Sequence, residues 1–263
     1  SPDDYPSSFI GAIALMRQTY YDAKWYAGLG ATKKEVNPSL EAINKRTSLP
    51  NIIELNHSLS VRNVELLEKE FDKTFIMVGV GKEYLALKEM TSTSKMIVPL
   101  NFPKALAVED PYLARMSSLE ELKHWEAAPF NPVILIENGV QICLTRDTIA
   151  SSKEFLKNLK KAMDCGLSHK EALRALTITP ATWLNLGSNI GSLEIGKMAN
   201  LMICNTTMDQ EDFRVESHWT RGVKVFESDP SYSDMQGVYN LVVDGKAGAI
   251  TLGALYAGAI PTE

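Results

Sequence analysis

The apolar residues of the first 195 positions follow two patterns that alternate along the chain. Short continuous apolar runs predict buried strands, and they lie at 51–55, 74–80, 95–100 and 140–145. Longer runs with apolar residues at helical spacing predict helices, and they lie at 7–28, 33–44, 60–71, 82–90, 118–128, 131–139 and 151–166. Strands that alternate with helices indicate βα units and a parallel sheet. The sequence therefore predicts an α/β fold for this part of the chain.

The pattern changes after residue 198, where strand-like segments replace the helices. These segments are 199–205, 217–227 and 239–258. Inside the last segment, Asp244–Gly245 favours a hairpin turn. We therefore expect an α/β part at residues 1–197 and a β-rich part at residues 198–263.

The most regular stretch of the sequence, residues 171–205, contains residues with backbone roles. Ser168 with Glu171 forms a capping box for a helix. Thr179 is expected to cap a second short helix, and Gly187 to end it. We assign no catalytic role to these residues, so the stretch is predicted to be a structural junction between the two parts.

Composition excludes several classes of protein. The net charge of −5 and the pI of about 5.5 argue against a partner that is nucleic acid or an anionic membrane. No apolar run approaches the roughly 18 residues that span a bilayer. Three isolated cysteines, without a CxxC spacing, indicate buried thiols and no zinc site. The sequence leaves the cellular compartment open, and a small-molecule substrate is the expected partner.

The junction resembles the C-terminal signature of the amidohydrolase superfamily. The residues that carry the resemblance are Thr177, Pro180, Ala181, Ile190–Leu193, Gly196–Lys197 and Ala199–Leu201, with Asn200 where the family usually has Asp. The resemblance, to imidazolonepropionase-like and dihydroorotase-like members, implies a metal-dependent (β/α)8 barrel of the TIM type. The last helix of such a barrel leads into a small β-sandwich. The chain would then be the C-terminal half of the barrel, approximately strands five to eight, followed by part of the sandwich.

Other segments are similar to a divergent group of the family found in Bacteroidetes. They are residues 79–84, 98–103, 122–132 and 156–167. This second resemblance covers nearly the whole chain.

The resemblance implies a metal site at the carboxyl ends of the strands. Asp147 follows the eighth strand, where the family's Asp binds metal and takes a proton from the attacking water. Considered alone, an Asp after a strand is more often a helix N-cap. Glu54 and Val78 lie where the family has histidine ligands; Glu54 could bind a metal and Val78 cannot. His57 follows closely and is a further candidate near the site, although such a residue is more often a solvated loop residue or helix cap.

The family's first His-x-His pair has no counterpart in this sequence. We therefore expect this chain to be a fragment of a longer protein. The full-length protein is expected to hold a divalent metal, with zinc as the first choice, whereas this chain alone need not hold one. Half a barrel exposes apolar strand faces, so we also expect the isolated chain to form a homo-oligomer.

Two further segments carry candidate binding residues. Lys123 and His124 lie between the last two strands and are expected to face the substrate; the alternative is a charged helix end. Residues 79–84, "GVGKEY", invite an anion-binding interpretation. They lack a full phosphate-loop pattern, so a tight strand-to-helix turn is the better prediction.

Two hypotheses for function remain. In the first, the full-length protein is a metal-dependent hydrolase of a non-peptide C–N bond, in a cyclic amide, an amide or a dipeptide-like substrate, and this chain alone is inactive. In the second, the barrel has lost catalysis and serves as a binding or scaffold protein, which Val78 supports. A flavodoxin-like binding module is disfavoured by the junction and the β-rich part.

Overall fold

The computed structural model describes residues 6, 8–29, 35–46, 48–227, 237–243 and 246–252. The chain divides into two compact units. The first unit comprises residues 1–199 and 206–213, and the second comprises residues 200–205 and 214–263. The hairpin turn predicted at Asp244–Gly245 lies outside the described residues.

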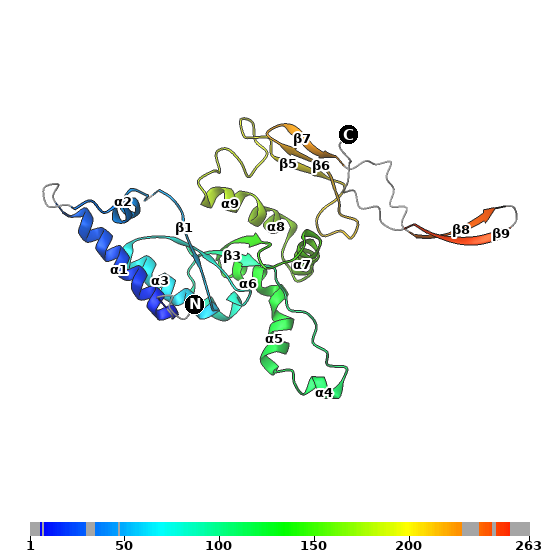
Figure 1. Cartoon of the computed structure of the whole chain (residues 1–263), viewed down its shortest axis with the longest axis horizontal. Helices are drawn as coiled ribbons and strands as arrows, with labels where there is room; N and C mark the ends of the chain where they lie inside the picture. Colours follow the sequence, from blue (N-terminus) through cyan, green and yellow to red (C-terminus); the bar gives the residue numbers. More distant parts are fainter. Residues whose placement is uncertain are drawn as a thin grey trace. The chain divides into compact units, whose positions relative to one another are not determined.

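The first unit contains the predicted parallel sheet. Its strands are β1 (Asn51–Glu54), β2 (Phe75–Val78), β3 (Lys95–Pro99) and β4 (Gln141–Thr145). They pair in the order β1-β2-β3-β4, and every pair is parallel (Figure 1). Each strand is joined to the next by a helical segment, as the alternating pattern predicts. The prediction of an α/β fold with a parallel sheet is therefore confirmed; closure into a barrel stays a prediction.

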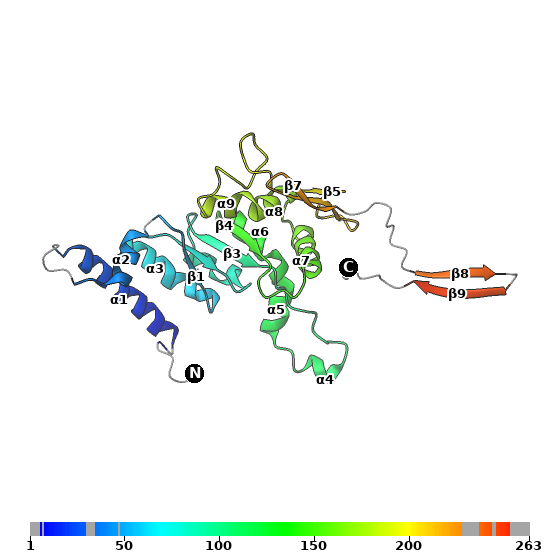
Figure 2. The ribbon, with the colours of Figure 1, turned by 45° about the horizontal axis from the view of Figure 1, so that its top comes forward.

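Helices of the first unit begin and end close to the predicted positions. The helical segments are α1 (Phe9–Ala27), α2 (Pro38–Lys45), η2 (Ser58–Ser60), α3 (Val61–Phe71), η3 (Glu83–Glu89), α4 (Pro111–Ala114), α5 (Leu119–Ala127), η4 (Ala128–Phe130), α6 (Asn131–Glu137), α7 (Ser152–Asp164), α8 (His169–Leu176) and α9 (Ile178–Trp183). Side chains of Ser8, Ser118 and Ser151 accept a backbone N–H of the first turn of α1, α5 and α7. Figure 2 shows α4 and α5 on a segment that extends from the rest of the unit.

One face of the sheet packs against helices and forms the main core. Phe75 and Met77 of β2 point to this face and are almost fully buried, while Ile76 between them points to the opposite face. Leu67 of α3 and Leu159 of α7 are completely buried in the same core. Each such side chain stabilises the fold by roughly 1.5–3 kcal/mol.

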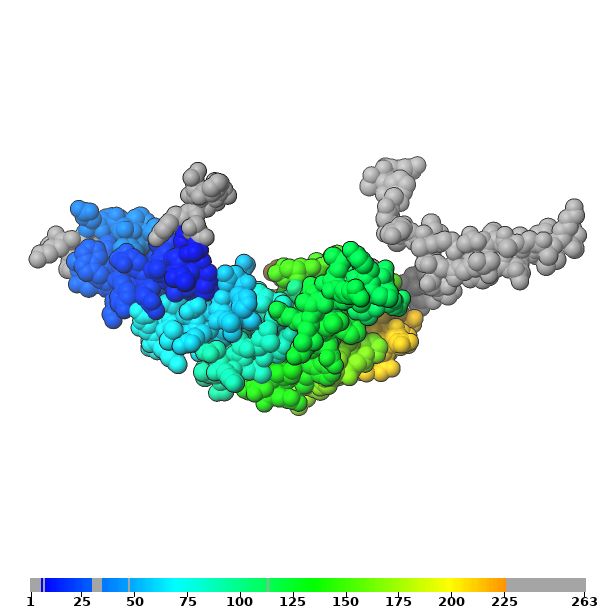
Figure 3. Space-filling model, turned by 90° about the horizontal axis from the view of Figure 1, so that it is seen from below, coloured from blue at the N-terminus to red at the C-terminus, as the bar shows by residue number. Residues whose placement is uncertain are grey.

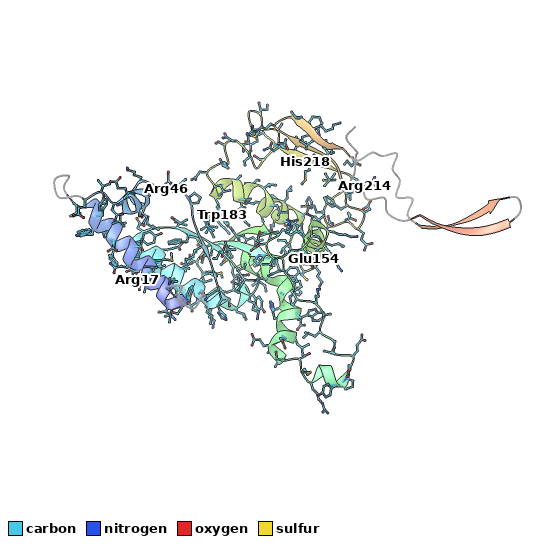
Figure 4. All side chains as sticks on the ribbon, viewed as in Figure 1. Arg17, Arg46, Glu154, Trp183, Arg214 and His218 are labelled. Atoms are coloured by element: carbon cyan, nitrogen blue, oxygen red, sulfur yellow. The ribbon has the colours of Figure 1, made fainter. Side chains whose placement is uncertain are left out.

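The opposite face of the sheet is also apolar. Ile76 and Cys143 on this face are covered by Trp183, which lies at the end of α9 (Figure 4). Trp183 Nε1 donates a hydrogen bond of 3.4 Å to Oε1 of Gln141, the first residue of β4. Ile52 of β1, by contrast, is 54% exposed. The face away from the core is thus closed beside β4 and open beside β1.

The junction confirms some predicted caps and corrects others. Ser168 and Glu171 form the predicted capping box of α8. Thr179 does not cap a helix, because α9 already begins at Ile178 and Thr179 lies inside it. Gly187 does not end α9 either. Asn185 adopts φ 59° there, and Leu186 N donates to the carbonyl oxygen of Ala181, which together form a Schellman motif that Asn tolerates nearly as well as Gly.

The described residues of the second unit form two antiparallel groups of strands. One joins β5 (Leu201–Cys204), β6 (Val215–Thr220) and β7 (Val223–Glu227), and the other joins β8 (Gly237–Val243) and β9 (Lys246–Leu252). Arg221 and Gly222 both have positive φ, as a two-residue type I′ hairpin requires. Asn200 Oδ1 accepts the backbone N–H of Arg221, which links the residue before β5 to this turn. The β-sandwich itself stays a prediction.

Candidate active site

The carboxyl ends of the four parallel strands bring candidate residues to one edge of the sheet. Glu54 is the last residue of β1, and it pairs in register with Val78, the last residue of β2. Asp147 follows the end of β4 by two residues. In (β/α) folds this edge carries the chemistry. Glu54 and Asp147 thus lie at the same end of the sheet, on its two outer strands, β1 and β4.

A local turn orients Asp147. Its backbone N–H donates to Thr145 Oγ1 at 3.1 Å, and its Oδ1 accepts the N–H of Thr148 at 3.0 Å. Thr148 has φ 64°, an uncommon conformation outside glycine. The interpretation of Asp147 as a helix cap is wrong, because Ser151 caps α7. The carboxylate is exposed to solvent.

Glu54 and His57 are also exposed. The Nδ1 atom of His57 accepts the N–H of Leu59 at 3.2 Å, and His57 is the N-cap of η2. The helix-cap interpretation of His57 is therefore confirmed. With Nδ1 engaged as an acceptor, Nε2 carries the proton of the neutral ring and is a donor.

The residues at this edge do not complete a metal site. In the part of the chain that the structure describes, no group of three or more His, Cys, Asp or Glu side chains could hold a metal ion. Val78, level with Glu54, carries no ligand atom. Glu54 and Asp147 can each offer carboxylate oxygen, which suits a hard cation, but the geometry supports no reaction step through a metal.

The "GVGKEY" loop after β2 has an internal anion. Glu83 is completely buried, and its Oε1 accepts the backbone N–H groups of Val80 and Gly81, the latter at 2.8 Å. Its Oε2 accepts Asn131 Nδ2 at 2.6 Å. A Cβ on Gly79 would lie 2.7 Å from Glu83 Cδ, so glycine is required there. The N–H groups that could bind a phosphate already bind the loop's own carboxylate. The segment is a tight turn from β2 to η3, as predicted.

Next to this loop, η3 and α5 enclose an open hollow of about 700 Å³. Figure 3 shows the green segment that includes α5 at the surface of the first unit. The hollow is lined by Lys82, Tyr84, Leu85, Leu119, Glu120, Lys123, His124, Glu126, Ala127 and Phe130. The Oη atom of Tyr84 lies 3.1 Å from His124 Nδ1. The two rings stack at 20°, with centroids 6.2 Å apart.

Burial and neighbouring charges set the protonation of this aromatic pair. Burial, followed by the charge of Lys82, lowers the pKa of His124, although Glu83 and Glu120 oppose this shift. Burial also raises the pKa of Tyr84, and the same two carboxylates add to that shift. At neutral pH the imidazole is therefore uncharged and the phenol keeps its proton.

The structure brings together only part of the predicted site. Lys123 and His124 line the hollow, whereas Glu54, His57 and Asp147 do not. Sequence reasoning missed Lys82 and Tyr84, although both lie in the "GVGKEY" segment that it singled out. The sequence offered no signal for them, because the burial of Glu83 between two partly exposed side chains is seen only in the structure.

Comparisons with known proteins agree with the fold. The sequence model of the Amidohydrolase family matches residues 50–248. The chain is similar in structure to an amidohydrolase from Thermotoga maritima MSB8, with a TM-score of 0.67 and 23% identity over 85% of this chain and 57% of that one. It is also similar to an uncharacterized protein, with a TM-score of 0.50 and 16% identity over 72% of this chain and 47% of that one. No curated protein matches.

These similarities have a clear extent. The chain spans 57% and 47% of the lengths of these two solved structures. Because the sequence identities are low, these two similarities show the fold alone. None of the described helices is long and apolar enough to cross a membrane. The family match covers all four strands of the parallel sheet, the junction and most of the β-rich part. On this evidence, the chain belongs to the amidohydrolase family.

Proposed function

We propose that the protein represented by this chain hydrolyses a non-peptide carbon–nitrogen bond, in a cyclic amide, an amide or a dipeptide-like substrate. The observation that carries the proposal is the family match across residues 50–248, which includes the whole carboxyl edge of the sheet. Because the chain spans 57% of the length of the Thermotoga protein, the activity is proposed for the whole protein, and this chain alone is expected to be inactive.

Asp147 is the proposed proton acceptor. Its carboxylate accepts the N–H of Thr148 and its backbone N–H donates to Thr145, and its exposure leaves it accessible to water. A carboxylate in this position can take a proton from an attacking water molecule. We also propose Asp147 and Glu54 as ligands of a divalent metal, zinc first. The described residues supply no complete ligand set, so the remaining ligands would have to come from elsewhere.

The test replaces Asp147 with Asn in the complete protein, with Asp164→Asn as the matched control. Asp164 is an exposed helix residue that bonds to Lys160, away from the carboxyl edge. We expect Asp147→Asn to lower hydrolysis of a panel of lactams, N-acyl amino acids and dipeptides by about 100-fold or more, and to lower the bound metal measured by mass spectrometry. Unchanged metal content and unchanged hydrolysis would refute the role of Asp147.

The second candidate function is a binding or scaffold protein that keeps the fold without catalysis. Val78, in register with Glu54, favours it, because a side chain without ligand atoms stands where the family has a histidine. A complete protein that is folded and free of metal, and that hydrolyses none of the panel, would support this candidate over the enzyme.

We also propose that the isolated chain associates with itself. Among the described strands, β1 pairs only with β2, and Ile52 on its open face is 54% exposed. An unpaired edge next to exposed apolar surface favours pairing with another copy. Light scattering at micromolar concentration should give at least twice the monomer mass, and Ile52→Lys should reduce it. A stable monomer would contradict this proposal.

A further inference from the structure

The charged side chains that line the hollow between η3 and α5 balance one another. Lys82 and Lys123 carry positive charge, and Glu120 and Glu126 carry negative charge. Lys82 Nζ lies 3.6 Å from Glu120 Oε1, so one pair is already partly neutralised within the protein. Among the side chains that line this hollow, an anion or a cation therefore finds no net opposite charge. The balance favours an uncharged ligand.

The Tyr84–His124 pair offers one donor and one acceptor. If Tyr84 donates to Nδ1, then His124 Nε2–H remains as a donor and the phenol oxygen as an acceptor. If Nδ1–H donates to the phenol instead, the phenol O–H is the remaining donor and Nε2 the acceptor. Both tautomers of the neutral imidazole thus match a ligand edge that has an N–H beside a C=O.

The rest of the lining is apolar. Leu85 is 56% exposed, Leu119 66% and Phe130 42%, which is high for side chains of this size. Exposed apolar surface around a few convergent polar groups is typical of small-molecule sites. A ligand with an apolar body would cover these three side chains and gain from their removal from water.

The protein fixes the backbone of Tyr84 before a ligand arrives. The backbone N–H of Tyr84 donates to Asn131 Oδ1 at 2.9 Å. Asn131 in turn donates to Glu83, and both residues are almost fully buried. A prearranged group loses less conformational entropy on binding than a mobile one.

We infer that this hollow binds an uncharged planar group that carries an N–H donor beside a C=O acceptor and is attached to an apolar body. Tyr84 and His124 contact the polar edge, and Leu85, Leu119 and Phe130 contact the apolar part. This inference does not rest on the proposed function, because Asp147 does not line the hollow.

The test measures binding of phenylacetamide to the whole chain by NMR, with phenylacetate and 2-phenylethanol as comparison probes. Phenylacetamide has an N–H donor beside a C=O acceptor in one planar group. Phenylacetate keeps acceptor oxygens but is charged and has no N–H donor, and 2-phenylethanol has a single hydroxyl group in place of the planar amide. We expect phenylacetamide to bind about threefold to tenfold more tightly than either. Equal or tighter binding of phenylacetate, or no binding of phenylacetamide, would overturn the inference. This comparison uses the unchanged protein, so it does not depend on the folding of a variant.

Tyr84→Phe keeps the ring and removes the hydroxyl group. It should weaken phenylacetamide binding by about threefold to tenfold, while Tyr112→Phe, at an exposed tyrosine outside the hollow, should not. Equal effects of the two variants would overturn the inference.

Failure of this inference can be separated from failure of the proposed function. Asp147→Asn should lower hydrolysis by about 100-fold or more, and it should leave phenylacetamide binding unchanged, because Asp147 does not line the hollow. If hydrolysis is absent but the probes bind in the expected order, the site stands and the proposed enzyme does not. If hydrolysis depends on Asp147 but phenylacetamide does not bind, only this inference fails.

Discussion

The buried pair of Glu83 and Asn131 makes a sharp prediction, because its hydrogen bonds have a fixed direction. The N–H of Tyr84 requires the oxygen of the Asn131 amide, so Nδ2 must face Glu83. Glu83 must accept from Asn131 on one side and from two backbone N–H groups on the other. In Glu83→Gln, either orientation of the new amide puts its NH2 against another donor.

The expected cost follows from the type of bond. Hydrogen bonds to a charged group contribute roughly 1.5–3 kcal/mol each and neutral ones roughly 0.5–1.5 kcal/mol, and a buried unsatisfied donor costs roughly 1–3 kcal/mol. We expect Glu83→Gln to destabilise the first unit by about 3 kcal/mol. Asn131→Asp puts two buried carboxylates in contact and should also cost about 3 kcal/mol or more.

The double variant, Glu83→Gln with Asn131→Asp, restores the pattern. The new amide at position 83 can accept the two backbone N–H groups and donate to the new carboxylate at position 131, which still accepts the N–H of Tyr84. We therefore expect a total loss of about 3 kcal/mol or less instead of about 6, a coupling of about 3 kcal/mol. Urea unfolding followed by circular dichroism measures each free energy, and Glu137→Gln, exposed on α6, is the control. Additive effects of the two substitutions would refute the directional network.

Three further predictions can be tested in the same way. Gly191→Ala should destabilise the chain by about 1–3 kcal/mol, because the new Cβ would lie 2.7 Å from Ala181 Cβ, and it should cost more than Gly196→Ala, where φ is also positive but no atom lies within 4 Å. Burial raises the pKa of Cys143 to about 12, so iodoacetamide at pH 8 should label it in urea and not in the native chain, as read by mass spectrometry. Burial lowers the pKa of His124, so NMR titration should give a midpoint below about 6.5; its contribution to stability is present above that pH and is lost as pH falls through the lowered pKa.

The arrangement of strands and helices could be predicted from the sequence because each element is locally consistent. Buried strands read as continuous apolar runs, and amphipathic helices begin at serines such as Ser151 that satisfy unpaired N–H groups. The junction showed where such reasoning ends. Thr179 followed by proline has a helix-start pattern, yet the helix begins at Ile178. Likewise, Asn185 adopted the left-handed conformation that Gly187 was expected to supply.

The candidate site was less predictable, because it depends on contacts between distant segments. Tyr84 and His124 are 40 residues apart, and no local pattern links them. His124 was singled out from its own segment, whereas Tyr84 was seen only as part of a glycine turn. The role of Asp147 was ambiguous because an Asp after a strand can cap the next helix or bind a metal, and the structure shows that Ser151 caps α7.

The internal carboxylate of the "GVGKEY" loop connects stability to recognition. Glu83 fills the anion position of the loop and, through Asn131, fixes the backbone of Tyr84. A phosphate could bind in this loop only if the Glu83 carboxylate moved out. The buried N–H groups that now donate to Glu83 would then lose their acceptor, and the backbone of Tyr84 would lose its support through Asn131. The hydrogen bonds of Glu83 and Asn131 that leave no room for an anion therefore also fix the backbone from which the phenol of Tyr84 reaches His124. Variants at Glu83 that still fold should lose phenylacetamide binding although residue 83 itself does not line the hollow.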